Sequence, residues 1–247
     1  NWRVDPSICD ILAEMGTEQI FKVVRFKLFN FNLAFNLDTV GFTFVILALL
    51  LILAFFIRKN LQLIPGKFQV LIEELITYFR TVLYESMEER GLKFVPFITS
   101  LFLFVLFSNW LNVIPHFRPP TRDVNTTLGL AVLVLVIAHV NGIRTKGWKN
   151  YLKAYFQPYW FMFPSNLFSE FGKTVSHAFR LYGNIFAGGI IIGVVPEILV
   201  KLFHWLGVPV GVVLMTVANL FFGLFIGAIQ ALVFAMLAVA YITIQAS

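Results

Sequence analysis

The most constraining feature of this sequence is a long carboxy-terminal run without charge: from Leu202 to Ser247 there is no Lys, Arg, Asp or Glu. A run of this kind is typical of a chain buried in lipid. A single helix over 209–245 would be roughly 55 Å long at about 1.5 Å per residue. The hydrocarbon core of a bilayer is only about 30 Å thick, so such a helix must be steeply tilted or broken.

The segment before this run, residues 158–196, is equally long and carries three charges in apolar surroundings: Glu170, Lys173 and Arg180. A Leu-Gly-Val-Pro sequence at 206–209 is typical of a turn between the two segments. The sequence therefore predicts a long tilted hairpin over residues 158–245.

Composition agrees with a membrane location. The chain is 59% hydrophobic and 13% charged, with a mean hydropathy of +0.82, whereas soluble domains carry about 25% charged residues. Its net charge of +6 does not indicate nucleic acid, because the basic residues lie at the ends of apolar runs, where they anchor helices to headgroups. With Cys9 as the single cysteine and dispersed histidines, we expect no disulfide, no metal site and no cofactor.

Hydropathy and periodicity predict an all-α membrane protein of one domain, residues 1–247, with about five transmembrane helices. The expected spans outside the hairpin are 39–57, 94–115 and 124–143, and residues 1–38 form an amino-terminal tail. Residues 68–90 contain five glutamates between helically spaced apolar residues, which predicts an amphipathic helix at the membrane surface or against a partner.

The distribution of basic residues predicts the orientation. Loops 58–93 and 144–155 carry ten Lys and Arg, against seven in the tail and the remaining turns. Since basic loops stay on the cytoplasmic side, we expect the amino terminus outside and the carboxy terminus inside.

Arg180 lies in the middle of the first hairpin segment. On a helix, Ser176, Arg180 and Asn184 share one face because they are four residues apart. A charge at the bilayer centre costs about 2.5–3.5 kcal/mol on insertion scales, and intramembrane charges are functional by default. Lys173 fits either a functional role or snorkelling toward the inner surface, and His177 fits either lining a polar path or packing.

The second hairpin segment has a matching stripe. Asn219, Gly223, Gly227 and Gln230 share one face, at steps of four, four and three. Small residues allow helices to approach closely, and the two amides supply hydrogen-bonding groups without charge. Packed against the Arg180 helix, this face would line a narrow polar path.

Three motifs in order resemble those of subunit a of F-type ATP synthases, across roughly residues 40 to 245. Residues 179–188, Phe-Arg-Leu-Tyr-Gly-Asn-Ile-Phe-Ala-Gly, resemble its R-L-[FY]-G-N-x-x-A-G signature. Residues 119–127 are similar to its P-[ST]-x-D-x-N-x-T turn, and residues 229–234 to its I-Q-A-[FL]-[IV]-F core.

This resemblance implies a non-catalytic stator subunit that passes ions through two offset half-channels to the buried carboxylates of a rotor c-ring. Arg180 would be the electrostatic gate between the half-channels. The outer half-channel would contain Asn184 and Gln230, with Asn109 and Asn112 near its mouth. Glu170 and Ser176 would lie toward the inner half-channel, and Asn219 and His177 are further candidates for half-channel lining. The implied partners are the ring, peripheral-stalk b subunits and the lipid bilayer, in a bacterial plasma membrane or an organellar energy-coupling membrane.

The chain departs from the family pattern in the outer half-channel. Gly189 stands where many members have Glu, and Gly223 where some have His. Glu197 is either a substitute for the missing acid or a helix-end anchor. Loss of a titratable relay also fits sodium, because a hydrated Na⁺ needs space and oxygen ligands, so the transported ion is expected to be H⁺ or Na⁺.

Two other classes of membrane protein could also carry charged residues inside the membrane. A stand-alone secondary transporter or channel is disfavoured because no internal repeat is visible. An intramembrane enzyme is disfavoured because no Ser/His or His/Asp pair has suitable spacing. Partner dependence distinguishes these classes, since a transporter works alone.

Overall fold

The computed structural model describes residues 23–28, 31–62, 65–114, 119–156, 159–203 and 207–246. Helices dominate this part of the chain, and four stretches are long and apolar enough to cross a membrane: Thr39–Lys59, Lys67–Leu111, Val124–Lys146 and Pro209–Ala246. The chain is an all-α membrane protein, as its hydropathy predicts.

The long helices follow the expected segments closely. The 39–57 span falls within α2 (Leu37–Lys59), the 94–115 span begins with α4 (Val95–Leu111), and the 124–143 span falls within α5 (Val124–Lys146). The ends have local causes. Arg58 and Lys59 occupy the last turn of α2, a favourable place for cations, and the Asp123 carboxylate caps α5 by accepting from Asn125 N.

The acidic segment forms α3 (Lys67–Met87), followed by a 3₁₀ turn (Glu88–Phe94) that leads into α4. All five of its glutamates are exposed, while Phe79 and Leu83 are fully buried. α3 packs on α4 and α9 (Gly227–Ala246). This placement fits an amphipathic helix with its apolar face against the rest of the chain.

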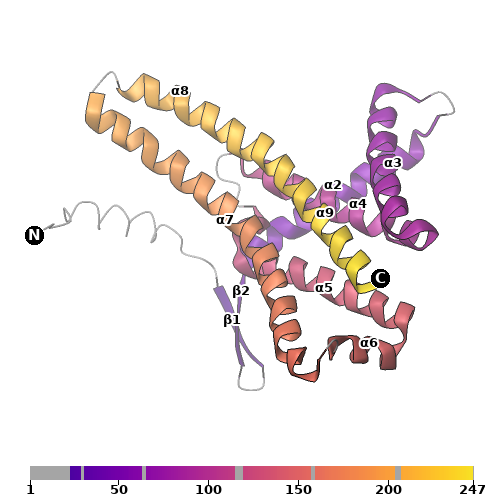
Figure 1. The fold of residues 1–247 in the computed structure, drawn as a ribbon. Helices are drawn as coiled ribbons and strands as arrows, with labels where there is room; N and C mark the ends of the chain where they lie inside the picture. Colours follow the sequence, from indigo (N-terminus) through magenta and orange to yellow (C-terminus); the bar gives the residue numbers. More distant parts are fainter. Residues whose placement is uncertain are drawn as a thin grey trace, which may run out of the picture.

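The carboxy-terminal half is a pair of very long antiparallel helices. α7 (Phe163–Phe203) has 41 residues, which is about 60 Å at 1.5 Å per residue. It lies beside α8 (Gly207–Leu220) and α9, which are joined without a break by a π-helical turn (Phe221–Ile226) (Figure 1). α8 already begins at Gly207, inside the expected 206–209 turn, because a proline in the first helical turn loses no hydrogen bond.

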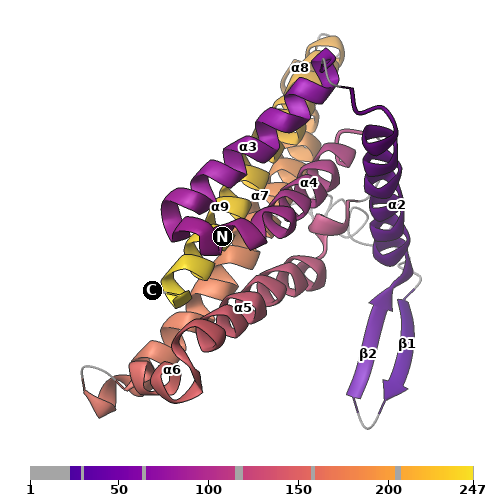
Figure 2. The same cartoon turned by 90° about the vertical axis from the view of Figure 1, so that its right-hand side faces the viewer.

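The core lies where α4, α5, α7 and α9 meet. Its buried side chains come from all four helices and from α3, and they include Phe79, Phe102, Val105, Val134, Leu181, Phe234 and Ile242. The short helix α6 (Trp148–Tyr155) lies at one end of this bundle, and α2 stands to one side (Figure 2).

Part of the amino-terminal tail forms an antiparallel β-hairpin that was not expected from the sequence. β1 (Val23–Leu28) pairs with β2 (Phe31–Asn36), with Leu28 opposite Phe31 and Phe26 opposite Leu33. Residues 24–28 alternate apolar and polar side chains, a period-two pattern that predicts strands, whereas Ala34 interrupts the alternation in β2. The signal is present but short, and residues 1–22 of the tail lie outside the described residues.

Candidate functional site

Arg180 lies on an open, apolar face of α7. Ser176, Arg180 and Asn184 are all exposed, and they share one face because they are spaced by four residues. Large exposed apolar side chains surround them on the same helix: Phe168, Phe171, Val175, Phe179, Phe186 and Ile190. No described carboxylate pairs with Arg180, so its guanidinium is left for a group outside this part of the chain.

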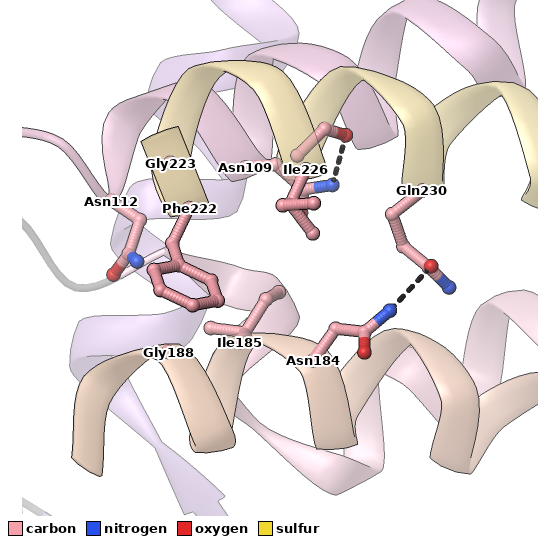
Figure 3. Close-up of a pocket in the computed structure, with 10 residues that line it drawn as sticks. Asn109, Asn112, Asn184, Ile185, Gly188, Phe222, Gly223, Ile226 and Gln230 are labelled. Atoms are coloured by element: carbon pink, nitrogen blue, oxygen red, sulfur yellow. Dashed lines mark hydrogen bonds between the residues drawn. The ribbon is translucent and has the colours of Figure 1, made fainter. Parts of the chain in front are cut away.

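One turn beyond Arg180, Asn184 makes a direct link to α9. Its Nδ2 donates to Oε1 of Gln230 at 2.6 Å (Figure 3). Gln230 is 5% exposed, and its own Nε2 has no partner among the described residues. A buried amide with a free donor indicates a place for a polar guest, because such a group otherwise costs about 1–3 kcal/mol.

This pair borders a narrow cleft between the end of α4, α7, the π-helical turn and α9 (Figure 3). The cleft is lined by Asn109, Asn112, Asn184, Ile185, Gly188, Phe222, Gly223, Ile226, Gly227 and Gln230. Four of these ten side chains are neutral amides and none is titratable. The cleft is therefore polar but uncharged, and Arg180 lies just past its end.

Asn109 holds the wall of the cleft in place. Its Nδ2 donates to the Gly227 carbonyl at 2.9 Å, and its Oδ1 accepts from the Thr121 hydroxyl at 3.1 Å. Gly227 allows this approach, since a Cβ there would lie 3.0 Å from the Cβ of Asn109. Asn109 is thus a structural member of the cleft, whereas the Asn112 side chain has no hydrogen bond to any described residue.

The end of α8 and the π-helical turn make further links to the end of α4. Asn219 Nδ2 donates to the Val113 carbonyl at 3.1 Å, and Trp110 Nε1 donates to the Leu224 carbonyl at 3.2 Å. Val113 also occupies the space beside Gly223, so that a Cβ at Gly223 would collide with its Cγ2. Gly189, by contrast, has open space. Packing against Val113 therefore excludes a larger side chain at Gly223, whereas the space beside Gly189 could hold one.

A second polar group lies at the other side of Arg180, toward the start of α7. Lys173 Nζ pairs with Glu170 Oε1 at 3.0 Å, and the Lys173 carbonyl accepts from the Tyr241 hydroxyl of α9 at 3.3 Å. Of the two roles open to Lys173, this pairing favours a structural one. Tyr241 was not among the expected residues, because an isolated tyrosine in an apolar helix has no distinctive spacing.

His177 faces the helix interface and not the open stripe. It is 2% exposed, and its ring packs edge-on against Phe234 with centroids 3.8 Å apart. Neither ring nitrogen has a partner among the described residues. The side chain is therefore packed like a core residue.

A hydrogen-bonded chain closes the end of the bundle near α6. Tyr151 Oη donates to Gln245 Oε1 at 2.8 Å and lies 3.2 Å from Tyr155 Oη, which lies 3.2 Å from His139 Nε2. Burial, with the nearby Tyr155, raises the pKa of the Tyr151 phenol well above its usual range. Tyr151 therefore stays protonated and remains a donor to α9.

The residues expected to act together thus fall into two groups. Four amides line the cleft with Asn219 beside it, and Glu170 lies with Lys173 on the opposite side of Arg180. The described residues contain no group of three His, Cys, Asp or Glu side chains arranged to hold a metal ion.

Comparison with known proteins assigns the family. Residues 40–243 match the profile of the ATP synthase A chain family. The chain is 34% identical to ATP synthase subunit a of Staphylococcus carnosus, over 90% of this chain and 95% of that one. It is 34% identical to the Bacillus subtilis subunit a (86% and 93%) and 36% identical to that of Geotalea daltonii (83% and 86%). The match covers both polar groups and Arg180, and the chain belongs to the ATP synthase A chain family.

Proposed function

We propose that this chain is the ion-translocating stator subunit of a rotary F-type ATP synthase, with Arg180 as the gate between two half-channels. The observation that carries the proposal is the position of Arg180: unpaired among the described residues, on an open apolar face, next to a neutral amide cleft. A guanidinium fixed on such a face can form an ion pair with a membrane-buried carboxylate of a partner subunit.

The rotor ring supplies that carboxylate. At about 4 Å and an effective dielectric constant near 20, a pair of unit charges is worth about 4 kcal/mol, or about a thousand-fold in an equilibrium constant. A ring carboxylate that reaches Arg180 must therefore release its ion, and it cannot carry the ion from one half-channel into the other. The guanidinium suits this role because it stays charged at physiological pH.

The two polar groups, one on either side of Arg180, belong to different half-channels. The outer one passes through the amide cleft of Asn109, Asn112, Asn184 and Gln230, with Asn219 holding its wall. The inner one begins near Glu170 and includes Ser176 on the open face. The contacts of His177 support packing, and we assign it to the helix interface and not to the ion path.

The exposed apolar side chains around Arg180 form the surface for the c-ring. Peripheral-stalk b subunits and lipid cover other apolar faces, in a bacterial plasma membrane such as those of the matched relatives. The subunit itself carries out no nucleotide chemistry. The ion is H⁺ or Na⁺, and direct ²²Na⁺ uptake by the ATP-driven complex distinguishes them.

The gate is tested in the whole complex reconstituted in liposomes. We expect Arg180→Ala to abolish ATP-driven ion pumping while subunit composition stays normal, because the ring carboxylate no longer has to release its ion. Phe55→Ala, an exposed apolar residue on α2 and away from the Arg180 face, is the control and should retain pumping. Normal coupled synthesis with Arg180→Ala would refute the gate.

A further inference from the structure

Two polar contacts connect α7 with α9, one on each side of Arg180. Asn184 bonds to Gln230 at 2.6 Å, and Tyr241 bonds to the Lys173 carbonyl at 3.3 Å. The two contacts are eleven residues apart on both helices, which corresponds to about 16 Å along the axis. A route through the helix interface would thus connect the outer group to the inner group without passing the open face.

The interface between these contacts is apolar on α9. Residues 231–240 read Ala-Leu-Val-Phe-Ala-Met-Leu-Ala-Val-Ala, and Ala231, Phe234, Ala235 and Ala238 are at most 1% exposed. α5 packs against both helices and contributes the buried Val134 and Ala138. No group on this stretch of α9 can hold an ion or bind water.

On α7 the same stretch divides into two faces. Ser176 and Arg180 are exposed, whereas His177, Ala178 and Leu181 are at most 2% exposed. His177 is the one titratable side chain that this stretch turns inward. Its ring fills the space against Phe234 at 3.8 Å, and its nitrogens have no partner among the described residues.

We propose that His177, Ala178, Leu181, Ala231 and Phe234 form a dry seal that prevents ions from leaking between the half-channels behind Arg180. An ion entering this region would lose its hydration and find no partner on α9, at a cost of several kcal/mol. Ions then cross only over the open face, where the ring carboxylate must meet Arg180. The inference rests on the proposed function, since a seal requires two half-channels.

The seal is weakest at His177, because the two ring nitrogens of this residue are polar and have no partner among the described residues. A purely apolar cavity stays dry, whereas a cavity bordered by polar atoms admits water. Removing the Phe234 ring would open space beside the free nitrogens of His177, one turn from the free Nε2 of Gln230. Water could then bridge the two polar groups.

The test measures passive ion flux through the reconstituted complex after the ring carboxylates are blocked with a carbodiimide. We expect Phe234→Ala to raise this ring-independent flux about tenfold or more and Phe234→Leu to restore the wild-type value. Adding His177→Leu to Phe234→Ala should lower the leak again, because the cavity becomes apolar. Phe79→Ala creates a similar cavity on α3, which packs on α4 and α9 and lies outside the α7–α9 interface, and should leave the flux unchanged.

Three results would contradict the proposed seal or the role given to His177 in it. Wild-type flux with Phe234→Ala would show that the interface is closed by other means, and an equal leak from Phe79→Ala would show general loosening. His177→Leu alone should retain pumping, and loss of pumping would place His177 on the ion path. Failure of the gate is distinguishable, because Arg180→Ala would then pump normally whatever the blocked-ring flux.

Discussion

At the scale of single residues, Asn109 shows how the cleft depends on buried hydrogen bonds. Both ends of its amide are used, by Gly227 and Thr121, and the residue is 2% exposed. We expect Asn109→Ala to lower the stability of the complex by about 1–3 kcal/mol, because the Gly227 carbonyl and the Thr121 hydroxyl lose their partners. The measurement is the temperature at which pumping is lost on heating.

Asn112→Ala is the matched control for this prediction. It removes an amide from the same cleft, but its side chain has no bond to a described residue, so the stability should stay near wild type. If the two variants are equally unstable, the bonds of Asn109 are not what holds the wall.

The resemblance to the family names the amides of the cleft, and the structure brings Asn109, Asn112, Asn184 and Gln230 together around one space. The sequence does not reveal that Thr121 orients Asn109 or that Val113 fills the place beside Gly223. Both contacts depend on how the end of α4 meets the π-helical turn. Such packing has no period along the chain, so no sequence pattern reports it.

At the scale of elements, Gly142 decides how closely α5 approaches α6 and α9. A Cβ at this position would lie 2.6 Å from the Tyr151 ring and 2.7 Å from the Gln245 carbonyl oxygen. We expect Gly142→Ala to destabilise the complex by about 1–3 kcal/mol, as overpacking does, and to loosen the end of α9. Thermal inactivation and protease sensitivity of the carboxy terminus measure the two effects.

Gly129→Ala provides the control within the same helix. Nothing lies within 4 Å of a Cβ there, and replacing a helical Gly by Ala stabilises by about 0.5–1 kcal/mol. The two substitutions should therefore act in opposite directions. A loss of stability from Gly129→Ala equal to that from Gly142→Ala would contradict the packing explanation.

Long elements are more predictable from this sequence than short ones. The helices α2, α4 and α5 fall where uncharged runs of about 20 residues predict them, because burial in lipid demands such a run. The hairpin of β1 and β2 offers only six residues a strand. The π-helical turn at 221–226 has no distinctive composition. Its position follows from the contacts of Trp110 and Asn219, which lie far apart in the sequence.

At the scale of the whole molecule, the amide cleft, the Glu170–Lys173 pair and Arg180 do not make a complete pathway for an ion. Arg180 stands on an open face, and the described part of that face offers no carboxylate to carry an ion past it. The surrounding surface is apolar and exposed, and patches of this kind mark an interface with protein or lipid. We therefore expect the chain to work against a partner that supplies the missing carboxylate.

This incompleteness separates the proposal from a stand-alone transporter. We expect the purified chain in liposomes to show no H⁺ or ²²Na⁺ uptake above protein-free vesicles, because the ion has no carrier between the two polar groups. The same chain assembled with its ring and stalk should conduct, and a carbodiimide should stop that flux. Arg180→Ala in the isolated chain is the control and should change nothing. Saturable, ion-selective uptake by the isolated chain would mean that it holds its own ion site, and the half-channel mechanism would have to be abandoned.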